Sequence, residues 1–363
     1  MSEKVKKFFE KKSNKIICGV AAGVILLGAA GGITACALVK KNKNAKYALT
    51  RLDVYSKLEK NSEWVLTGYE EFKNNSKGLP LSEKIYGLDK ENNPILNSEH
   101  IKDYDANGYL SFSDYKVFSN DGKIFNRIKL ESTNDSFGNE TKRIVYDFKK
   151  DNITVTEMNE FFTEYTFDDL NRVIEKKEYT LNGTTKEYVN KYTYEYFKDT
   201  NRITNEKSYY FADEFVLEEE QRLTIADDGK LVKYEMFDET VFVKKTDFTY
   251  INSTTVKCVD SESEDGTKSD SEIIYTFRSE EDAKNIVFIT DDIFYEIEGL
   301  TKKEVFQYDD FSKTSLQVHF VDSYSYDKHE NVSSIEEEYH HYIGGELNQT
   351  NFYKEAYTYE KIK

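Results

Sequence analysis

The stretch from Asp103 to Asp114 holds the residue types and spacing most suited to chemistry. Five residues follow the ligand spacing of a calcium loop: Asp103, Asp105, Asn107, Tyr109 and Asp114. Gly108 would allow the sharp turn at the loop's sixth position, so that the oxygens surround one cation. The alternative is a plain hairpin turn, because Gly108 also belongs to a series of regularly spaced turn residues. Calcium is the only cofactor that the sequence indicates.

Alternating tyrosines form a second candidate site. Tyr192, Tyr194 and Tyr196 share one side of an extended segment, because side chains alternate along a strand. Aromatic residues are favoured in binding surfaces, and exposed rings stack on sugars or peptides. We therefore consider these tyrosines as a ligand platform, with the packed core face of a hairpin as the alternative.

Catalytic motifs are missing from the sequence. Glu338 and His340 would lie on one side of a strand and His341 on the other, which leaves too few ligands for a metal site. Cys258 has no histidine nearby in sequence, and we find no GxSxG, HExxH or P-loop pattern. The sequence therefore predicts that the protein is not an enzyme. An envelope-associated hydrolase with a carboxylate site between β layers is the alternative.

The N-terminal region is apolar and bracketed by lysines. Residues 16–39 contain no charge and would span about 36 Å as a helix, which predicts a transmembrane helix or signal-anchor behind a basic cytoplasmic tail, residues 1–15. The sequence ending in Cys36 is similar to a lipobox, so lipidation of Cys36 is an alternative, as is a cleaved signal. Two small-residue pairs would permit self-association of the helix: Gly19 with Gly23, and Gly28 with Gly32.

The charge distribution limits the range of partners. The chain has a net charge of −17, although its first 46 residues hold ten Lys and two Glu, so the rest is strongly acidic. Such a body repels phosphate backbones, and we predict no nucleic-acid partner. Cys258 is the one cysteine of the three outside the apolar segment, so the body has no internal disulfide.

A short internal period organises the body. Turn residues recur at Gly78, Asn93, Gly108 and Gly122 in steps of 15, 15 and 14 residues, and the segments between them alternate apolar and polar side chains. This pattern predicts an all-β fold, an elongated antiparallel meander of hairpins that curls or folds into sandwich-like layers. Helical spacing is confined to residues 46–58 and 280–286.

Tyrosine–aspartate pairs before several turns resemble the YD repeat of Rhs-type bacterial surface proteins. The pairs that carry the resemblance are Tyr324-Ser325-Tyr326-Asp327, Tyr165-Thr166-Phe167-Asp168 and Tyr104-Asp105. The resemblance covers most of residues 65–363 and implies a β-hairpin repeat architecture. It implies little about activity, because fold alone does not fix function.

These observations predict four segments: the tail 1–15, the transmembrane helix 16–39, a partly helical juxtamembrane linker 40–64 and the β-hairpin repeat domain 65–363. We expect a single-pass protein of the cell membrane with an extracytoplasmic body. Its predicted role is binding or structural, including adhesion, with an unidentified protein or glycan as ligand. A calcium-stabilised surface module is a further alternative.

Overall fold

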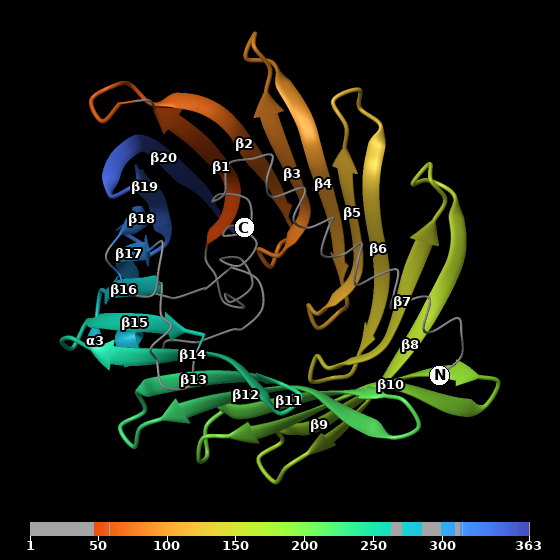
Figure 1. The fold of residues 1–363 in the computed structure, drawn as a ribbon. Helices are drawn as coiled ribbons and strands as arrows, with labels where there is room; N and C mark the ends of the chain where they lie inside the picture. Colours follow the sequence, from red (N-terminus) through yellow and green to blue (C-terminus); the bar gives the residue numbers. More distant parts are fainter. Residues whose placement is uncertain are drawn as a thin grey trace.

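The computed structural model describes residues 47–57, 59–262, 271–284, 299–308, 313 and 315–362, and antiparallel strands make up most of them. Each strand pairs with the strands before and after it in sequence, and the first pairs with the last (Figure 1). The predicted all-β antiparallel meander is therefore confirmed. The elongated, sandwich-like repeat is wrong, because the 20-stranded sheet closes on itself as a barrel.

The elements are β1 (Tyr47–Lys57), β2 (Val65–Asn74), β3 (Pro80–Leu88), β4 (Pro94–Tyr104), β5 (Leu110–Phe118), β6 (Ile124–Asn134), β7 (Glu140–Phe148), β8 (Val155–Phe167), β9 (Val173–Asn182), β10 (Thr185–Tyr196), β11 (Ile203–Phe211), β12 (Phe215–Ile225), β13 (Leu231–Asp238), β14 (Val241–Tyr250), β15 (Thr255–Ser261), β16 (Ser271–Phe277), α3 (Glu280–Lys284), β17 (Leu300–Tyr308), β18 (Leu316–Tyr326), β19 (Val332–Ile343) and β20 (Glu346–Lys361).

Aspartates at the ends of strands shape many of the hairpin turns. In the turn between β4 and β5, one carboxylate oxygen of Asp105 accepts the backbone N–H groups of Asn107 and Tyr109, each at 2.9 Å. Gly108 then takes a φ of 90°, which a residue without Cβ adopts at no steric cost. Asp135, Asp168 and Asp327 accept the same two kinds of backbone bond in their own turns.

The segment around β1 was predicted to be partly helical, and the structure corrects this. β1 pairs with β20, and its register shifts between Leu49 and Arg51. This bulge brings Leu49 and Leu52 to the same face, where both are buried, at 2% and 0% exposed. Because of the bulge, two buried leucines are three residues apart in the sequence, and this spacing is the one expected of a helix. The helical expectation at 280–286 is met in part by α3.

Two apolar clusters lie on the same face of the sheet. The first joins β13 to β17 with α3, whose Ala283 is fully buried against residues such as Tyr234 and Val256. The second gathers around the pairing that closes the barrel, with Leu49 and Leu52 of β1, Phe72 of β2 and Tyr357 of β20. The closing strands are thus held by apolar packing as well as by backbone hydrogen bonds.

Several predictions fall outside the described residues. These are the tail 1–15, the predicted transmembrane helix 16–39, Cys36 and the glycine pairs Gly19/Gly23 and Gly28/Gly32. Within the described ranges, no helix is both long and apolar enough to cross a membrane.

Candidate functional site

The strand register separates the residues of the sheet into two faces. Leu52 of β1 lies directly opposite Glu70 of β2 and Tyr357 of β20, and we call their side the buried face. Asp53 lies opposite Tyr69, and their side, which we call the charged face, carries most of the lysines, arginines and cross-strand ion pairs. Because side chains alternate along each strand, neighbouring residues in sequence contribute to different faces.

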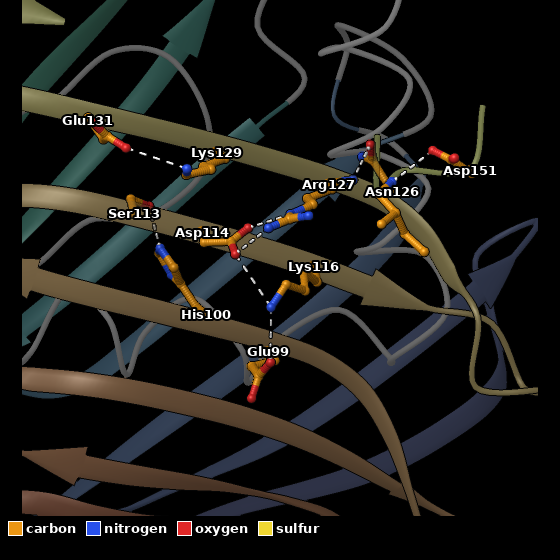
Figure 2. A network of polar contacts seen from close by, with 11 residues as sticks. Glu99, His100, Ser113, Asp114, Lys116, Asn126, Arg127, Lys129, Glu131 and Asp151 are labelled. Atoms are coloured by element: carbon orange, nitrogen blue, oxygen red, sulfur yellow. Dashed lines mark hydrogen bonds and ion pairs between the residues drawn. The ribbon is translucent and has the colours of Figure 1, made fainter. Parts of the chain in front are cut away.

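An ion-pair network crosses the charged face from β4 to β6 (Figure 2). The guanidinium of Arg127 donates two hydrogen bonds of 2.8 Å to the carboxylate of Asp114. Lys116 lies 3.4 Å from both Asp114 and Glu99, and so links β5 to β4. Burial alone would raise the pKa of Asp114, but the hydrogen bonds from Arg127 and the charge of Lys116 outweigh it and lower that pKa.

Aromatic rings accompany these charges across the same face. The guanidinium carbon of Arg127 lies 4.6 Å from the ring centre of Phe148. The ammonium of Lys129 lies 3.9 Å from the ring centre of Tyr146, whose hydroxyl donates a 2.7 Å hydrogen bond to Glu131. Such cation–π contacts contribute about 0.5–1 kcal/mol each at exposed sites. The charged face therefore presents rings, cations and carboxylates side by side.

The buried face carries a group of acids on either side of the pairing that closes the barrel. We call this group the seam cluster: Glu70 of β2, Glu83 of β3, Asp322 of β18, Glu337 of β19 and Glu355 of β20. Glu70, Glu83, Asp322 and Glu355 are each at most 7% exposed. Carboxylates at such positions need partners, because burial disfavours the charged form.

Only the outer members of the seam cluster have a basic partner within ion-pair distance among the described residues. Lys102 lies 3.4 Å from Glu83, and Lys303 lies 3.8 Å from Asp322. Glu355 instead accepts a short hydrogen bond from the hydroxyl of Tyr357. One carboxylate oxygen of Glu70 has no hydrogen-bond partner in the described structure.

The seam cluster holds protons near neutral pH. Burial and the neighbouring charge of Asp322 raise the pKa of Glu337 to about 8. Burial also raises the pKa of Glu355 to about 7, although the hydrogen bond from Tyr357 opposes the change. Burial and the charges of Glu83 and Glu355 raise the pKa of Glu70 well above its ordinary value. This arrangement can take up and release protons in the physiological range.

Histidines lie near strand partners on both faces. His319 and His340 are opposite each other on β18 and β19 with stacked rings 5.7 Å apart. Glu338 and His340 share a face as predicted, and Nε2 of His340 lies 3.3 Å from a carboxylate oxygen of Glu338. His100 is 2.7 Å from the hydroxyl of Ser113 (Figure 2), and burial lowers the pKa of His100 to about 3.

The structure divides the residues of the predicted calcium loop between a turn and two strands. Asp105 and Asn107 form the turn, whereas Asp114 lies within β5 and binds Arg127. Asp103 accepts the backbone N–H of Tyr104, and Tyr109 follows the turn. Among the described residues, no group of three or more His, Cys, Asp or Glu side chains is placed to hold a metal ion. The calcium site stays a prediction.

The tyrosines of the predicted ligand platform lie within β10. Tyr192 and Tyr194 are on the buried face, and burial raises the pKa of Tyr192 to about 12. Tyr196 donates its hydroxyl to the carbonyl of Val173 at 2.6 Å, and so ties the end of β10 to the start of β9. The three rings are partly buried, and their role in ligand binding stays a prediction.

The seam cluster was not predicted from the sequence, although the strands that hold it carry a signal for it. Glu355 is in phase with Tyr353 and Tyr357 along β20, and Asp322 is in phase with Tyr324 along β18. An acid at the same alternating positions as aromatic core residues marks a buried carboxylate.

Comparisons with known proteins give fold-level likeness only. No family model matches the chain, and no curated protein matches its sequence. Solved structures similar to it include a porin-like protein from Bacteroides uniformis, with 12% identity over 86% of this chain and 98% of that chain, and a TM-score of 0.35. A porin-like protein from Bacteroides vulgatus is 10% identical over 86% of this chain and 98% of that chain, with a TM-score of 0.25. The Tc holotoxin pore of Photorhabdus luminescens gives 10% identity over 77% of this chain and 18% of that chain, and a TM-score of 0.22.

Two predictions are corrected at this point. The assignment to the YD-repeat surface proteins is wrong, because the strands close into a single 20-stranded barrel and do not form an open hairpin repeat. The location as a single-pass protein of the cell membrane is corrected as well: the described residues form a closed β-barrel, and none of the described helices is long and apolar enough to cross a membrane. The Tyr–Asp pairs that prompted the YD assignment have a local role instead, since Tyr104 and Tyr326 tie strand ends together and the aspartates that follow them shape turns.

Proposed function

We propose that this chain is a cell-surface β-barrel with a binding or structural role, and that its wall stands in water. Charged side chains on both faces of the strands carry this proposal. On the charged face, Lys116 and Asp114 lie within β5, and on the buried face Glu70 and Lys102 lie within β2 and β4. A wall with ionisable groups on both faces suits an aqueous setting.

An outer-membrane barrel is the second candidate, and the wall chemistry counts against it. Such barrels present an apolar band about 25 Å tall to lipid, and Arg or Lys at the midplane costs about 2–4 kcal/mol. Turning the charged face outward would place Lys116 and Arg127 in hydrocarbon. Turning the buried face outward would do the same to Lys102 and the seam cluster.

The charged face supports binding rather than catalysis. Its half-buried rings and paired charges offer the contact groups that protein and glycan ligands use. A hydrolase would need accessible acids that converge on a substrate, whereas four members of the seam cluster are at most 7% exposed. We therefore take a protein or a glycan as the ligand class.

The route of attachment is a separate part of the proposal. Lipidation at Cys36 would hold a water-exposed barrel at a membrane surface without any need for the barrel wall to enter lipid. Cys36→Ser would then release the full chain from the membrane fraction, and metabolic labelling with a fatty acid would mark the wild type alone. Unchanged fractionation of Cys36→Ser and equal labelling would exclude this route.

The experiment that tests the proposed function is protease treatment of intact source cells, with fragments of residues 47–362 identified by mass spectrometry. Loss of these fragments while a cytoplasmic control protein survives is the result expected. Protection until the cells are lysed would overturn the surface location. A protease site introduced after residue 46 would allow residues 1–46 to be removed from the membrane-bound protein. If the barrel then stays in the membrane fraction until detergent is added, the outer-membrane candidate is favoured.

A further inference from the structure

The pairing between β20 and β1 closes the barrel, and we call it the seam. Its register runs from Tyr47 opposite Lys361 to Lys57 opposite Phe352. Every other pairing of the barrel joins strands that follow each other in sequence. The seam alone joins strands from opposite ends of the described chain (Figure 1). Opening it would turn the barrel into an open sheet without breaking any hairpin.

The seam cluster flanks this pairing on both sides. Glu355 is on β20 opposite Val54 of β1, and Glu70 is on β2 opposite Leu52 of β1. The two carboxyl groups therefore face each other across β1, whose buried-face residues between them are apolar. Repulsion between these two charges would act across the seam, and because both carboxyl groups are buried it would be weakly screened.

Among the described residues, no basic group lies within ion-pair distance of the central members, although the charge of Lys303 opposes the rise in the pKa of Glu337. Lys102 and Lys303 pair with Glu83 and Asp322, which are the outer members. Glu70 is 2% exposed and has a carboxylate oxygen without a hydrogen-bond partner in the described structure. Two buried carboxylates that share a site do not both ionise readily, so the central members favour the protonated form.

We propose that the seam is a pH-responsive closure of the barrel: protonation of the seam cluster holds β20 against β1, and ionisation of the cluster loosens them. The driving force is the repulsion between Glu355, Glu337 and Glu70 once all three are charged. Opening the seam admits water to these carboxylates and relieves both the repulsion and the loss of hydration.

Other titratable groups face the cluster from the neighbouring strands. Besides the acids, the groups that face it are Lys303 of β17, Tyr324 of β18, Tyr339 of β19, Tyr353 and Tyr357 of β20, and His100 and Lys102 of β4. Burial raises the pKa of Tyr324, Tyr353 and Tyr357, so these phenols stay neutral. Burial lowers the pKa of His100 to about 3, so it stays neutral as well.

The sign of the effect follows from the raised pKa values of the acids. A group whose pKa is higher in the folded state stabilises the fold below its unfolded pKa, and this contribution is lost as the pH rises through the folded value. For Glu355 and Glu337 the folded values are about 7 and about 8. The seam is therefore tightest below about pH 4.5, the ordinary pKa of these acids, and it loosens as the pH rises from there through about 7 and about 8.

Hydrogen–deuterium exchange of the full chain at pH 5.5 and pH 8.5, corrected for the intrinsic exchange rate, tests the proposal. We expect the protection of β1 and β20 to fall at least tenfold at pH 8.5 relative to the protection of β5 and β6, which serve as the internal reference. If the ratio of protection in β1 and β20 to protection in β5 and β6 is the same at the two pH values, the proposal is overturned. This comparison needs no variant.

Neighbouring residues of β19 supply a matched pair of variants. Glu337→Gln removes an acid from the seam cluster, whereas Glu336→Gln removes an acid from the charged face, where it lies 2.7 Å from Lys354. We expect E337Q, and likewise E355Q, to retain seam protection at pH 8.5, while E336Q behaves as the wild type. An equal pH response in E337Q and E336Q would overturn the assignment to the seam cluster.

Discussion

Asp322 and Glu337 lie directly opposite each other on β18 and β19 and are joined by a side-chain hydrogen bond on the buried face. A hydrogen bond between two carboxyl groups requires a proton on one of them. Burial raises the pKa of both, and the charge of Lys303 opposes the rise. The pair therefore shares one proton near neutral pH, so that the fold of this region depends on pH.

Removing one acid from this pair should stabilise the protein above neutral pH. Glu337→Gln keeps the shape and a donor for Asp322 but cannot ionise. The raised pKa of Glu337, about 8, means that the wild type loses stability as the pH rises toward 8. We expect the Tm of E337Q to exceed that of the wild type at pH 8.5, by about 2–4 °C for each kcal/mol gained in the free energy of unfolding. At pH 5 the two Tm values should agree, and a constant difference across the pH range would contradict the shared proton.

The bidentate pair between Arg127 and Asp114 should be the most costly single ion pair to break on the charged face. The two side chains are 18% and 7% exposed, so each is partly shielded from water. Asp114→Ala leaves Arg127 without this partner, and we expect a loss of about 2–3 kcal/mol in the free energy of unfolding. Denaturant unfolding of D114A, R127A and the double variant measures their coupling. Additive effects of the two substitutions would show that the pair contributes nothing specific.

Asp105 should stabilise its turn through backbone hydrogen bonds whether or not calcium is present. Asp105→Ala removes the carboxylate that accepts two backbone N–H groups, and we expect it to cost about 1 kcal/mol in the free energy of unfolding. Melting curves with 5 mM calcium and with a chelator should give the same difference between D105A and the wild type. A wild-type Tm that rises with calcium, and a rise that D105A abolishes, would instead establish the calcium loop.

The tyrosine hydroxyls that tie strand ends together should each contribute to stability. Tyr326 donates to the carbonyl of Leu300 at 2.6 Å, and Tyr104 donates to that of Pro80 at 2.9 Å. We expect Tyr326→Phe to lower the free energy of unfolding by about 1 kcal/mol, because the carbonyl loses its partner. Tyr210→Phe is the control, since Tyr210 is 42% exposed. Equal stability of the two variants would show that the hydroxyl of Tyr326 contributes nothing.

The sequence by itself determined the local features of this protein. Alternation of side chains identified extended segments such as the one around Tyr192, Tyr194 and Tyr196, and they form β10 as predicted. Recurrent Gly, Asn and Asp marked the hairpin turns, including the turn at Gly108. These features are local, because a strand face and a tight turn depend on residues only a few positions apart.

Tertiary structure decided the closure of the barrel and the placement of the acids. The pairing of Tyr47 with Lys361 joins the two ends of the described chain and leaves no local trace in either segment. The bulge that gives the sequence of β1 a helix-like spacing is defined by the register of β1 with β20, so it cannot be recognised from β1 alone. The seam cluster depends on the same closure, since Glu70 and Glu355 belong to strands that become neighbours across β1 only when the sheet is closed. A distant pairing sets which charges meet, and no short window of sequence contains both partners.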